Sequence, residues 1–384
     1  MIRRLIRIFK IDRRGPRRGL VIAVFVGLAL APDPGHGRED APSTHGAVYV
    51  RTDSDHTTVV SPRVRGRYAS PRTGTGVDIV YAADVWTSAS VDIRTAATAR
   101  VTEQRDELDV GVDQALADDH LTLGLGYRMS YEPDYLSNAI SASARLEALQ
   151  RNLTVEARGF VSLDRVGRSG DALFNERSLA AGGWIGVTQL LDRATILQLA
   201  GELRGVSGYQ ASPYRFVAID GAGRCGPEAS LCVPEVHPAR RLRVALVARA
   251  RRALHPRTSI GLGYRFYVDT WAIQSHTPTA DVAVQAARGL WLWLRYRGYF
   301  QSGARFYRAR YGPGDDLRYV TRDRELSSMF SHRLELTPRY TRSLGAQALE
   351  AGLLVAGALL GYDDFIGLDR VYALELSAHL GLSF

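Results

Sequence analysis

The chain ends in the segment Tyr372-Ala-Leu-Glu-Leu-Ser-Ala-His-Leu-Gly-Leu-Ser-Phe384, in which large apolar residues alternate with small or polar ones. Successive side chains of a β-strand point to opposite sides, so residues of one kind collect on one face. Leu374 and Leu376 then share a face suited to lipid, whereas Glu375 and Ser377 share a face suited to water. This pattern is typical of the wall of a membrane-spanning β-barrel.

The same alternation recurs along the chain. It is clear in four further segments, at 121–131, 153–164, 260–268 and 290–296. No stretch after residue 31 resembles a membrane-spanning helix, since the most apolar one, 348–361, is short and contains Glu350. Hydrocarbon cannot bond backbone N–H and C=O groups, so a spanning chain without apolar helices must pair them in a closed sheet. The sequence therefore predicts an all-β, transmembrane, antiparallel up-and-down β-barrel.

The connections between strands also alternate in length, with short periplasmic turns and long extracellular loops. Short links are expected near 70–74, 117–119, 150–152, 192–193, 255–257, 287–289 and 342–347. Long, charged loops are expected near 88–106, 165–177, 207–239, 270–277, 303–326 and 362–370. Counting back from a last strand that descends to the periplasm, and adding 48–52 as a first strand, predicts about sixteen strands, with fourteen or eighteen as alternatives.

The N-terminal region resembles a secretory signal peptide. A basic stretch precedes the apolar run Gly19–Ala31, about thirteen residues long, which is too short to cross a bilayer comfortably as a helix. Cleavage is expected near Ala31 or Gly37, which leaves residues 38–384 as the barrel. We therefore expect export to the outer membrane of a Gram-negative bacterium.

The overall charge gives little information about function. Residues 1–31 contribute +7 of the formal net charge of +9, so the mature chain is close to +2. A nucleic-acid partner is therefore not expected. The expected partners are outer-membrane lipid, the barrel-assembly machinery and, in one interpretation, another exported protein.

Two short features point to local roles. Cys225 and Cys232, the only cysteines, flank a Gly-Pro turn and are expected to form a disulfide in an exported protein. The terminal aromatic residue within an alternating strand resembles the signal by which assembly machinery recognises its substrates. Its residues are Tyr372, Leu380, Leu382 and Phe384.

Several segments resemble the uncharacterised outer-membrane family known as domain of unknown function 3570. The segments that carry the resemblance are 186–198, 208–217, 263–277 and 298–307, with a less specific match at 51–56 followed by Ser61-Pro62. The chain departs from the family pattern at Val268-Asp269-Thr270-Trp271, where two acidic residues are expected before the Trp, and in its inserted cysteine loop. The resemblance implies a barrel in the outer membrane and supplies no activity.

Arginines dominate the side of the strands expected to face the lumen. The predicted pore-lining residues are Arg63, Arg65, Arg67, Arg128, Arg158, Arg265, Arg295, Arg297 and Arg333. Acids are expected to face them across the lumen, namely Asp78, Asp84, Glu156, Glu202, Asp269, Asp281, Glu335 and Glu375. Two interpretations stay open, because the arginines can simply pair with these acids or can favour anions in an aqueous channel. Aromatic residues such as Tyr68, Tyr127, Tyr131, Trp184, Trp291, Trp293 and Tyr299 are expected in the interfacial girdles.

Catalytic chemistry has one weak candidate. Asp269, Ser275 and His276 are the residue types of a hydrolase site and lie in a family-like segment with Trp271, but their spacing fixes no mutual geometry. The histidines show no metal-ligand spacing, and no haem or nucleotide motif is present in the sequence, so no cofactor and no enzyme activity are expected.

Three functional hypotheses follow, in decreasing order of support. The first is a porin-like channel or transporter for small polar or anionic solutes. The second is a structural barrel that houses or binds another exported protein, and the third is an outer-membrane hydrolase. A lumen plugged by 207–239 or 303–326 weakens the first hypothesis, and a convergent Ser/His/acid cluster at the outer rim is required by the third.

Overall fold

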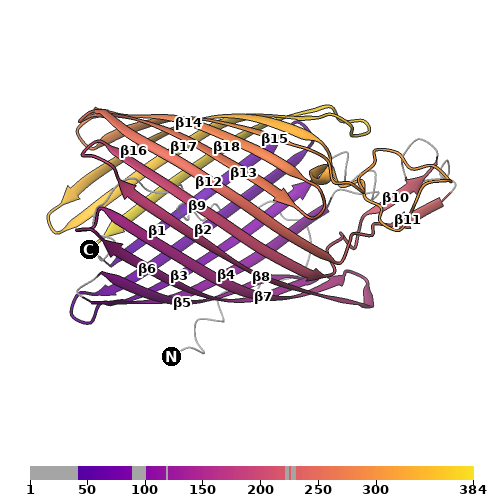
Figure 1. Cartoon of the computed structure of the whole chain (residues 1–384), viewed down its shortest axis with the longest axis horizontal. Coiled ribbons are helices and arrows are strands. Elements are labelled where there is room, and N and C mark those ends of the chain that lie inside the picture. The colour runs from indigo at the N-terminus through magenta and orange to yellow at the C-terminus, as the bar shows by residue number, and fades with distance from the viewer. Residues whose placement is uncertain (1–41, 89–100, 118–119, 221–224, 226–230) are drawn as a thin grey trace, which may run out of the picture.

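A single β-sheet closes on itself to form a barrel in the computed structural model, which describes residues 42–88, 101–117, 120–220, 225 and 231–384 (Figure 1). The expected signal peptide, residues 1–37, lies outside the described residues. No helix in the described part of the chain is long and apolar enough to cross a membrane.

The barrel wall has sixteen strands, each antiparallel to both of its neighbours, which confirms the predicted fold class and strand number. In chain order these are β1 (Ser43–Asp53), β2 (Thr57–Ser70), β3 (Thr75–Ser88), β4 (Val101–Leu116), β5 (Leu121–Glu132), β6 (Tyr135–Ala148), β7 (Leu153–Arg168), β8 (Asp171–Leu190), β9 (Thr195–Gly208), β12 (Arg240–His255), β13 (Thr258–Asp269), β14 (Gln274–Ala287), β15 (Leu290–Gln301), β16 (Met329–Leu344), β17 (Gln347–Tyr362) and β18 (Arg370–Ser383). The strands β10 (Phe216–Ile219) and β11 (Leu231–Pro234) form a separate hairpin outside the wall.

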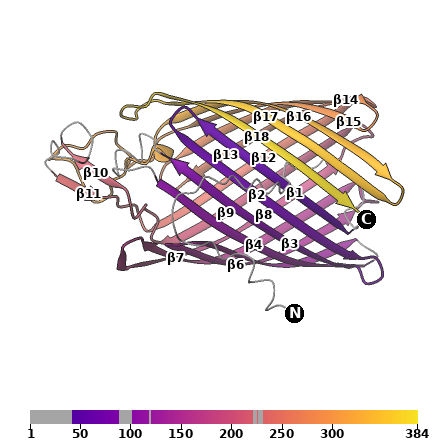
Figure 2. The ribbon, with the colours of Figure 1, turned by 180° about the vertical axis from the view of Figure 1, so that it is seen from behind.

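The first and last strands complete the barrel. β1 pairs with β18 from Ser43 opposite Ser383 to Asp53 opposite Ala373, and Figure 2 shows the two strands side by side. The Phe384 N–H donates to the Pro42 carbonyl oxygen at 2.9 Å, which extends this closure beyond the strand end. Each strand of the wall therefore has a partner on both sides, as hydrocarbon requires of a spanning sheet.

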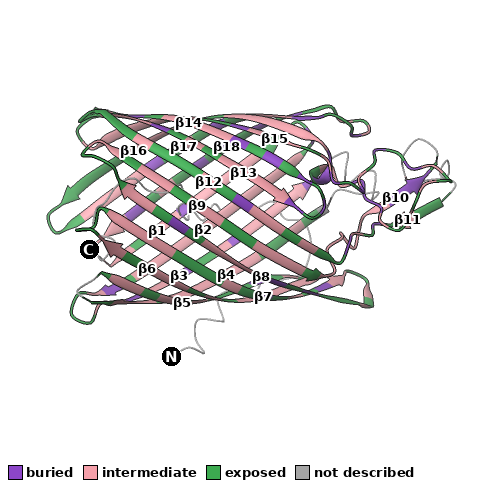
Figure 3. Cartoon of the chain, viewed as in Figure 1, coloured by how far each residue is buried: buried purple, intermediate pink, exposed green. Residues whose placement is uncertain are grey.

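The two faces of the wall follow the alternation in the sequence. In β18, Leu374 and Leu376 are 47% and 44% exposed, whereas Glu375 between them is 8% exposed. More and less exposed residues alternate along the other strands as well (Figure 3). The outward face is apolar and the inward face is mostly polar or small, which is the arrangement expected for lipid outside and water inside.

One predicted loop is wrong. The segment 165–177 continues β7 and β8 as a hairpin, and only residues 169–170 form its turn, with Gly170 at φ +80°. The charge of this segment led to the prediction of a loop. In the structure, Arg165 of β7 lies opposite Arg177 of β8, in the register of the extended hairpin. The two strands extend past the membrane at this point, where polar residues on both faces are solvated. The predicted loop 270–277 is likewise reduced to a turn at 270–273.

The remaining extracellular connections differ in size. Residues 209–239, 302–328 and 363–369 are long, as predicted, and the turns at the periplasmic end are short. Of the predicted loop 88–106, Ser88 ends β3, residues 101–106 belong to β4, and residues 89–100 lie outside the described part of the chain.

Candidate functional site

The described residues of two long extracellular connections fold together beyond the barrel, namely 209–220, 225 and 231–239 of the first and 302–328 of the second, and we call them the extracellular cap (Figure 1). Val217 and Ile219 of the first connection pack against Tyr311 and Val320 of the second in a buried apolar cluster. Val320 also exchanges backbone hydrogen bonds with Val236, both of 3.0 Å. The two connections therefore form one folded unit.

Glu235 forms an ionic centre within the extracellular cap. Its fully buried carboxylate accepts hydrogen bonds of 2.8 Å from the Thr321 hydroxyl and the Arg322 N–H, and lies 3.3 Å from the guanidinium of Arg215. Burial alone would raise the pKa of Glu235, but the nearby His237 imidazole, 3.6 Å away, the charge of Arg215 and the Arg322 N–H together lower it. The carboxylate is thus held in its charged form at the junction of the two connections.

The extracellular cap is attached around the rim of the barrel. Its contacts reach turns that lie between β1 and β2, β5 and β6, β7 and β8, and β17 and β18. These contacts are the Arg324–Asp55 ion pair at 2.7 Å, the hydrogen bond from Tyr214 to Asp134, the Ser169 N–H to the Tyr214 hydroxyl at 2.6 Å, and the Tyr307 hydroxyl to the Asp364 carbonyl at 2.6 Å. Because these turns are spread around the rim, the extracellular cap lies across the mouth of the barrel.

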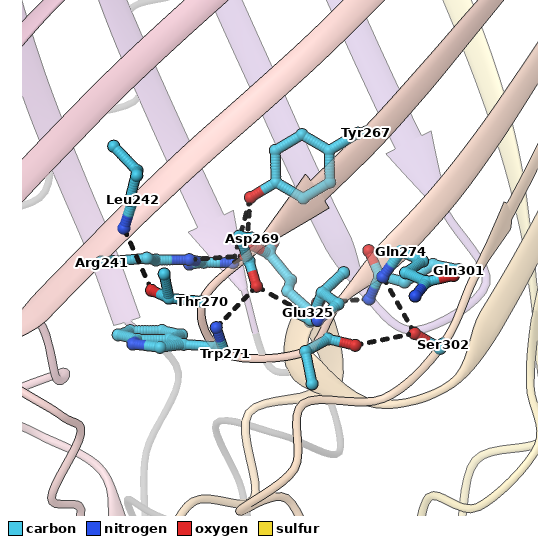
Figure 4. Close-up of polar contacts among 12 residues, drawn as sticks. Arg241, Leu242, Tyr267, Asp269, Thr270, Trp271, Gln274, Gln301, Ser302 and Glu325 are labelled. Carbon is cyan, nitrogen blue, oxygen red and sulfur yellow. Dashed lines mark hydrogen bonds and ion pairs between the residues drawn. The ribbon is translucent and has the colours of Figure 1, made fainter.

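A further attachment is built on Asp269, at the end of β13 (Figure 4). Its buried carboxylate accepts hydrogen bonds from Arg241 Nε at 2.8 Å and from the Tyr267 hydroxyl at 2.7 Å. It also accepts the backbone N–H groups of Trp271 at 2.9 Å and Ile273 at 3.1 Å, which fixes the β13–β14 turn. Trp271, itself 2% exposed, lies beneath the Arg241 guanidinium, 4.0 Å from the ring centroid.

Trp271 joins this turn to the extracellular cap. It packs in a buried cluster with Ile273, Ala304, Phe306 and Leu326, and its carbonyl oxygen accepts the Arg305 N–H at 2.9 Å. The family-like residues Asp269 and Trp271 therefore have a clear structural role at the rim.

The candidate hydrolase residues are not brought together. Ser275 is 1% exposed and faces the lumen beside Tyr267, whereas the next residue, His276, faces outward and lies 2.5 Å from the Tyr264 hydroxyl. A nucleophile and its base must lie within hydrogen-bond reach on one side of the wall. These two side chains point to opposite faces of β14.

A cavity of about 660 Å³ lies beneath the extracellular cap, and we call it the chamber. The inward faces of β9, β12 and β13 contribute Arg204, Arg241, Arg243 and Arg265 to its lining. Aromatic side chains and residues of the cap complete it, among them Tyr135, Tyr209, Tyr267, Trp271, His237 and Leu326.

The nine predicted pore-lining arginines lie on the inward face of their strands, and six of them have carboxylate partners. The partners are Asp78 for Arg65 at 2.6 Å, Asp113 for Arg67 at 2.9 Å, Asp109 for Arg128 at 2.6 Å, Glu202 for Arg265 at 3.5 Å, Glu335 for Arg295 at 3.6 Å and Glu375 for Arg333 at 2.8 Å. No carboxylate oxygen of the described residues lies within 4.0 Å of the guanidinium nitrogens of Arg63, Arg158 or Arg297.

The acids do not face the arginines across the lumen as predicted. Each of them pairs with an arginine on the same strand, the adjacent strand or the next one along the wall. Besides the pairs above, Asp84 binds Arg105, Glu156 lies 3.3 Å from Arg145, Asp269 binds Arg241, Asp281 binds Arg251, and Glu335 binds Arg333. The reason is geometric, since strand neighbours lie about 5 Å apart whereas the lumen of such a barrel is wide enough for water.

Five arginines form a band just below the extracellular rim, and we call them the arginine belt. They are Arg204 on β9, Arg243 on β12, Arg265 on β13, Arg297 on β15 and Arg333 on β16, each three or four residues from the extracellular end of its strand. Three of them, Arg204, Arg243 and Arg297, have no carboxylate of the described residues within 4.0 Å. The belt therefore carries excess positive charge.

The inner wall is also accessible to solvent below the cap. Arg128, Arg158, Arg249 and Arg297 point inward and are exposed, as is Glu202. Side chains packed into a filled lumen would be buried. Among the described residues, the extracellular cap thus covers an inner wall whose side chains are not packed over.

Sequence reasoning missed Arg204 and placed several aromatic residues on the wrong face. Arg204 lies two residues after Glu202 on the same strand and therefore shares its inward face, which was the available signal. Tyr68, Tyr127 and Tyr131 are exposed on the outer face, but Trp184, Trp291, Trp293 and Tyr299 alternate with outward residues and face the lumen. Arg339, an inward residue, lies over the Trp293 ring.

The other two predicted features are placed as follows. Cys225 and Cys232 are joined by a disulfide beside the β10–β11 hairpin, with their Cα atoms 5.8 Å apart. Tyr372 and Leu380 of β18 and the following Phe384 are exposed on the outer face, which Leu382 shares by alternation. Recognition of these residues by assembly machinery stays a prediction.

The closed wall, the apolar exterior and the polar interior define an outer-membrane β-barrel. The family model described as "Protein of unknown function (DUF3570)" matches residues 171–345, the region that holds the four segments that carry the resemblance to this family. The less specific motif at 51–62 lies outside the matched residues.

One solved structure supports the fold, and two others show weaker likenesses. A bacterial polysaccharide outer membrane secretin is similar with a TM-score of 0.52 and 10% identity over 90% of this chain and 99% of that chain. OprD of Pseudomonas aeruginosa matches with a TM-score of 0.42 and 11% identity, over 90% and 95% of the two chains, and a TodX monoaromatic hydrocarbon channel matches with 0.43 and 12%, over 90% of each. No curated protein matches the sequence. At these identities the likeness concerns the fold alone.

Proposed function

We propose that this outer-membrane barrel is a channel that favours small anionic solutes, with the arginine belt as its selective region. The proposal rests on the environment of Arg297. Its guanidinium is exposed to the lumen, and no carboxylate of the described residues lies within ion-pair distance of it. An unpaired cation on a hollow, water-accessible wall attracts anions and repels cations. Arg204 and Arg243 add to this excess on the same side of the lumen.

The extracellular cap limits how solutes reach the belt. Its attachments around the rim argue against a permanently wide pore, and the exposed inner wall beneath argues against a plug formed by the described residues. We infer a channel with a restricted mouth, in which solutes pass between the cap and the rim. A barrel that supports another exported protein remains the second candidate, because the folded cap offers a protein surface beyond the membrane.

The test is ion selectivity in planar bilayers. The barrel is refolded in detergent, inserted into bilayers, and its reversal potential is measured across a potassium chloride gradient. We expect a shift toward the chloride potential for the native chain and a smaller shift for the variant Arg204→Gln/Arg243→Gln/Arg297→Gln. Arg252→Gln is the matched control, since Arg252 lies on β12 but faces outward beside Thr195 near the periplasmic end.

Two outcomes would contradict the proposal. Equal reversal potentials in the native chain and the triple variant would show that the belt does not select ions. A folded, heat-modifiable barrel that never conducts would exclude the channel and favour the supporting barrel.

A further inference from the structure

The chamber contains two arginines placed directly against each other. Arg204 on β9 and Arg243 on β12 are cross-strand partners, and both face the lumen. Like charges directly opposite each other destabilise a sheet. On the other side of Arg243, the cross-strand partner is Asp269, so an acid is close by in the register.

Asp269 nevertheless does not neutralise this pair. Its carboxylate oxygens are occupied by Arg241, by Tyr267 and by two backbone N–H groups of the turn. The remaining acids of the chamber are engaged as well. Glu202 lies 3.5 Å from Arg265, Asp164 accepts hydrogen bonds of 2.6 Å from Ser137 and Ser162, Asp323 lies 2.9 Å from Arg215, and Glu325 has contacts of its own.

Both arginines also keep a donor without an acceptor. The Nε atoms of Arg204 and Arg243 are buried and have no hydrogen-bond partner in the structure. A buried cationic donor without an acceptor is costly, and oxyanions are the groups that satisfy guanidinium donors two at a time. The arrangement of the two guanidiniums therefore suits an oxyanion.

The surrounding residues shape this site. Arg204 lies over the Phe160 ring, 5.5 Å from its centroid, and the Cβ of any larger residue at Gly182 would come within 2.8 Å of that ring. Gly182 is the cross-strand neighbour of Arg204 on β8. The absence of a side chain there lets the Phe160 ring lie beside the Arg204 guanidinium.

We propose that Arg204 and Arg243 form a binding site for an oxyanion group with two negative charges, in the chamber beneath the extracellular cap. One anion bound between the terminal nitrogens of both guanidiniums would remove their repulsion and accept hydrogen bonds from both arginines. A dianion neutralises the pair, whereas a monoanion leaves one positive charge. This inference rests on the proposed function and deepens it, because it names the class of solute that the belt retains: phosphomonoesters or dicarboxylates.

The test is calorimetric titration of the detergent-folded barrel, in chloride buffer near neutral pH, with inorganic phosphate, succinate and acetate. We expect phosphate or succinate to bind about tenfold more tightly than acetate. Arg204→Gln and Arg243→Gln should each weaken this binding about tenfold, the loss of one charge-assisted hydrogen-bonding partner. Arg249→Gln is the control, since Arg249 is inward on β12 but lies outside the chamber and contacts Gln198.

A charge reversal gives a second measurement. Arg204→Glu places a carboxylate opposite Arg243, so the variant should lose dianion binding and retain its folded form to a higher temperature in a heat-modifiability assay. This outcome separates a lost site from a lost fold.

Each result is decisive. Tighter binding of phosphate alone assigns a phosphoryl site, and tighter binding of succinate alone assigns a dicarboxylate site. Equal affinity for acetate and both dianions, or unchanged affinity in both glutamine variants, overturns the inference. A barrel that conducts anions but binds no dianion would contradict the binding site and leave the proposed channel function standing. A barrel that binds a dianion but does not conduct would support the binding site and contradict the channel function.

Discussion

The substitution Asp269→Asn is expected to loosen the attachment of the extracellular cap to the barrel rim. Asparagine keeps one oxygen that can accept the N–H groups of Trp271 and Ile273, at present 2.9 and 3.1 Å away. It turns an NH2 group toward Arg241 and Tyr267, which are donors themselves. Breaking one partner of a buried ion pair costs about 3–5 kcal/mol. Because two hydrogen bonds survive, we expect about 3 kcal/mol.

Limited proteolysis measures this change. The cap connection 302–328 contains Arg322, which is 5% exposed and which trypsin can reach only after the cap opens, so cleavage is followed after this residue. When opening is fast relative to cleavage, the cleavage rate follows the population of the open form. A loss of about 3 kcal/mol therefore raises the rate of cleavage roughly a hundredfold, while the barrel strands stay resistant.

A matched substitution at the periplasmic end serves as the control. Asp192 is an exposed turn residue that accepts the Ala194 N–H at 2.7 Å, and Asp192→Asn should leave cleavage of the cap unchanged. A cleavage rate for Asp269→Asn within twofold of the native rate would refute the reasoning that Asp269 holds the cap to the rim.

Three further predictions concern other parts of the chain. Replacing Cys225 and Cys232 by serine should reduce the stability of the β10–β11 hairpin by about 2.5 kcal/mol, from the lost constraint on a short loop, with faster hydrogen exchange there and no change in the barrel. The lowered pKa of Glu235 means that its stabilisation is complete above its usual pKa and is lost as the pH falls through the lowered value. Acidification should therefore speed hydrogen exchange in the cap, and Glu235→Gln should remove that pH dependence. Deleting Phe384 should lower the amount of assembled barrel in cells severalfold without preventing refolding in detergent; equal amounts in cells would contradict its role in assembly.

The barrel itself could be predicted because its signal is local. Alternation within a strand such as β18 depends only on the medium on each side of the wall, so Leu376 and Glu375 reveal their faces without knowledge of any partner. The strand number followed from the same pattern and from the requirement that every strand have two neighbours. Hydrocarbon allows few alternatives to a closed sheet.

The pairing of side chains could not be predicted in the same way, because it depends on register. Arg204 and Arg243 are separated by a long connection that includes the β10–β11 hairpin, and nothing in their local sequence places one opposite the other. The packing of 209–239 against 302–328 is also a contact between distant segments. The charged segment 165–177 was misjudged because charge indicates water, and water is present both in a loop and around a hairpin that extends beyond the membrane.

The number of arginines on the inner wall is a poor measure of its selectivity. A pair such as Arg67 with Asp113 has no net charge, and salt screens what remains of its field within about 10 Å. Such pairs keep the lumen hydrated without favouring either ion. The sign of the net charge on the lumen wall is set instead by arginines such as Arg297, because no nearby acid of the described residues cancels its charge. Arg63 and Arg158 share this property lower on the wall, but Arg204, Arg243 and Arg297 bring three such charges together in one band beneath the cap. The region that restricts entry is therefore also the region that we propose to distinguish anions from cations.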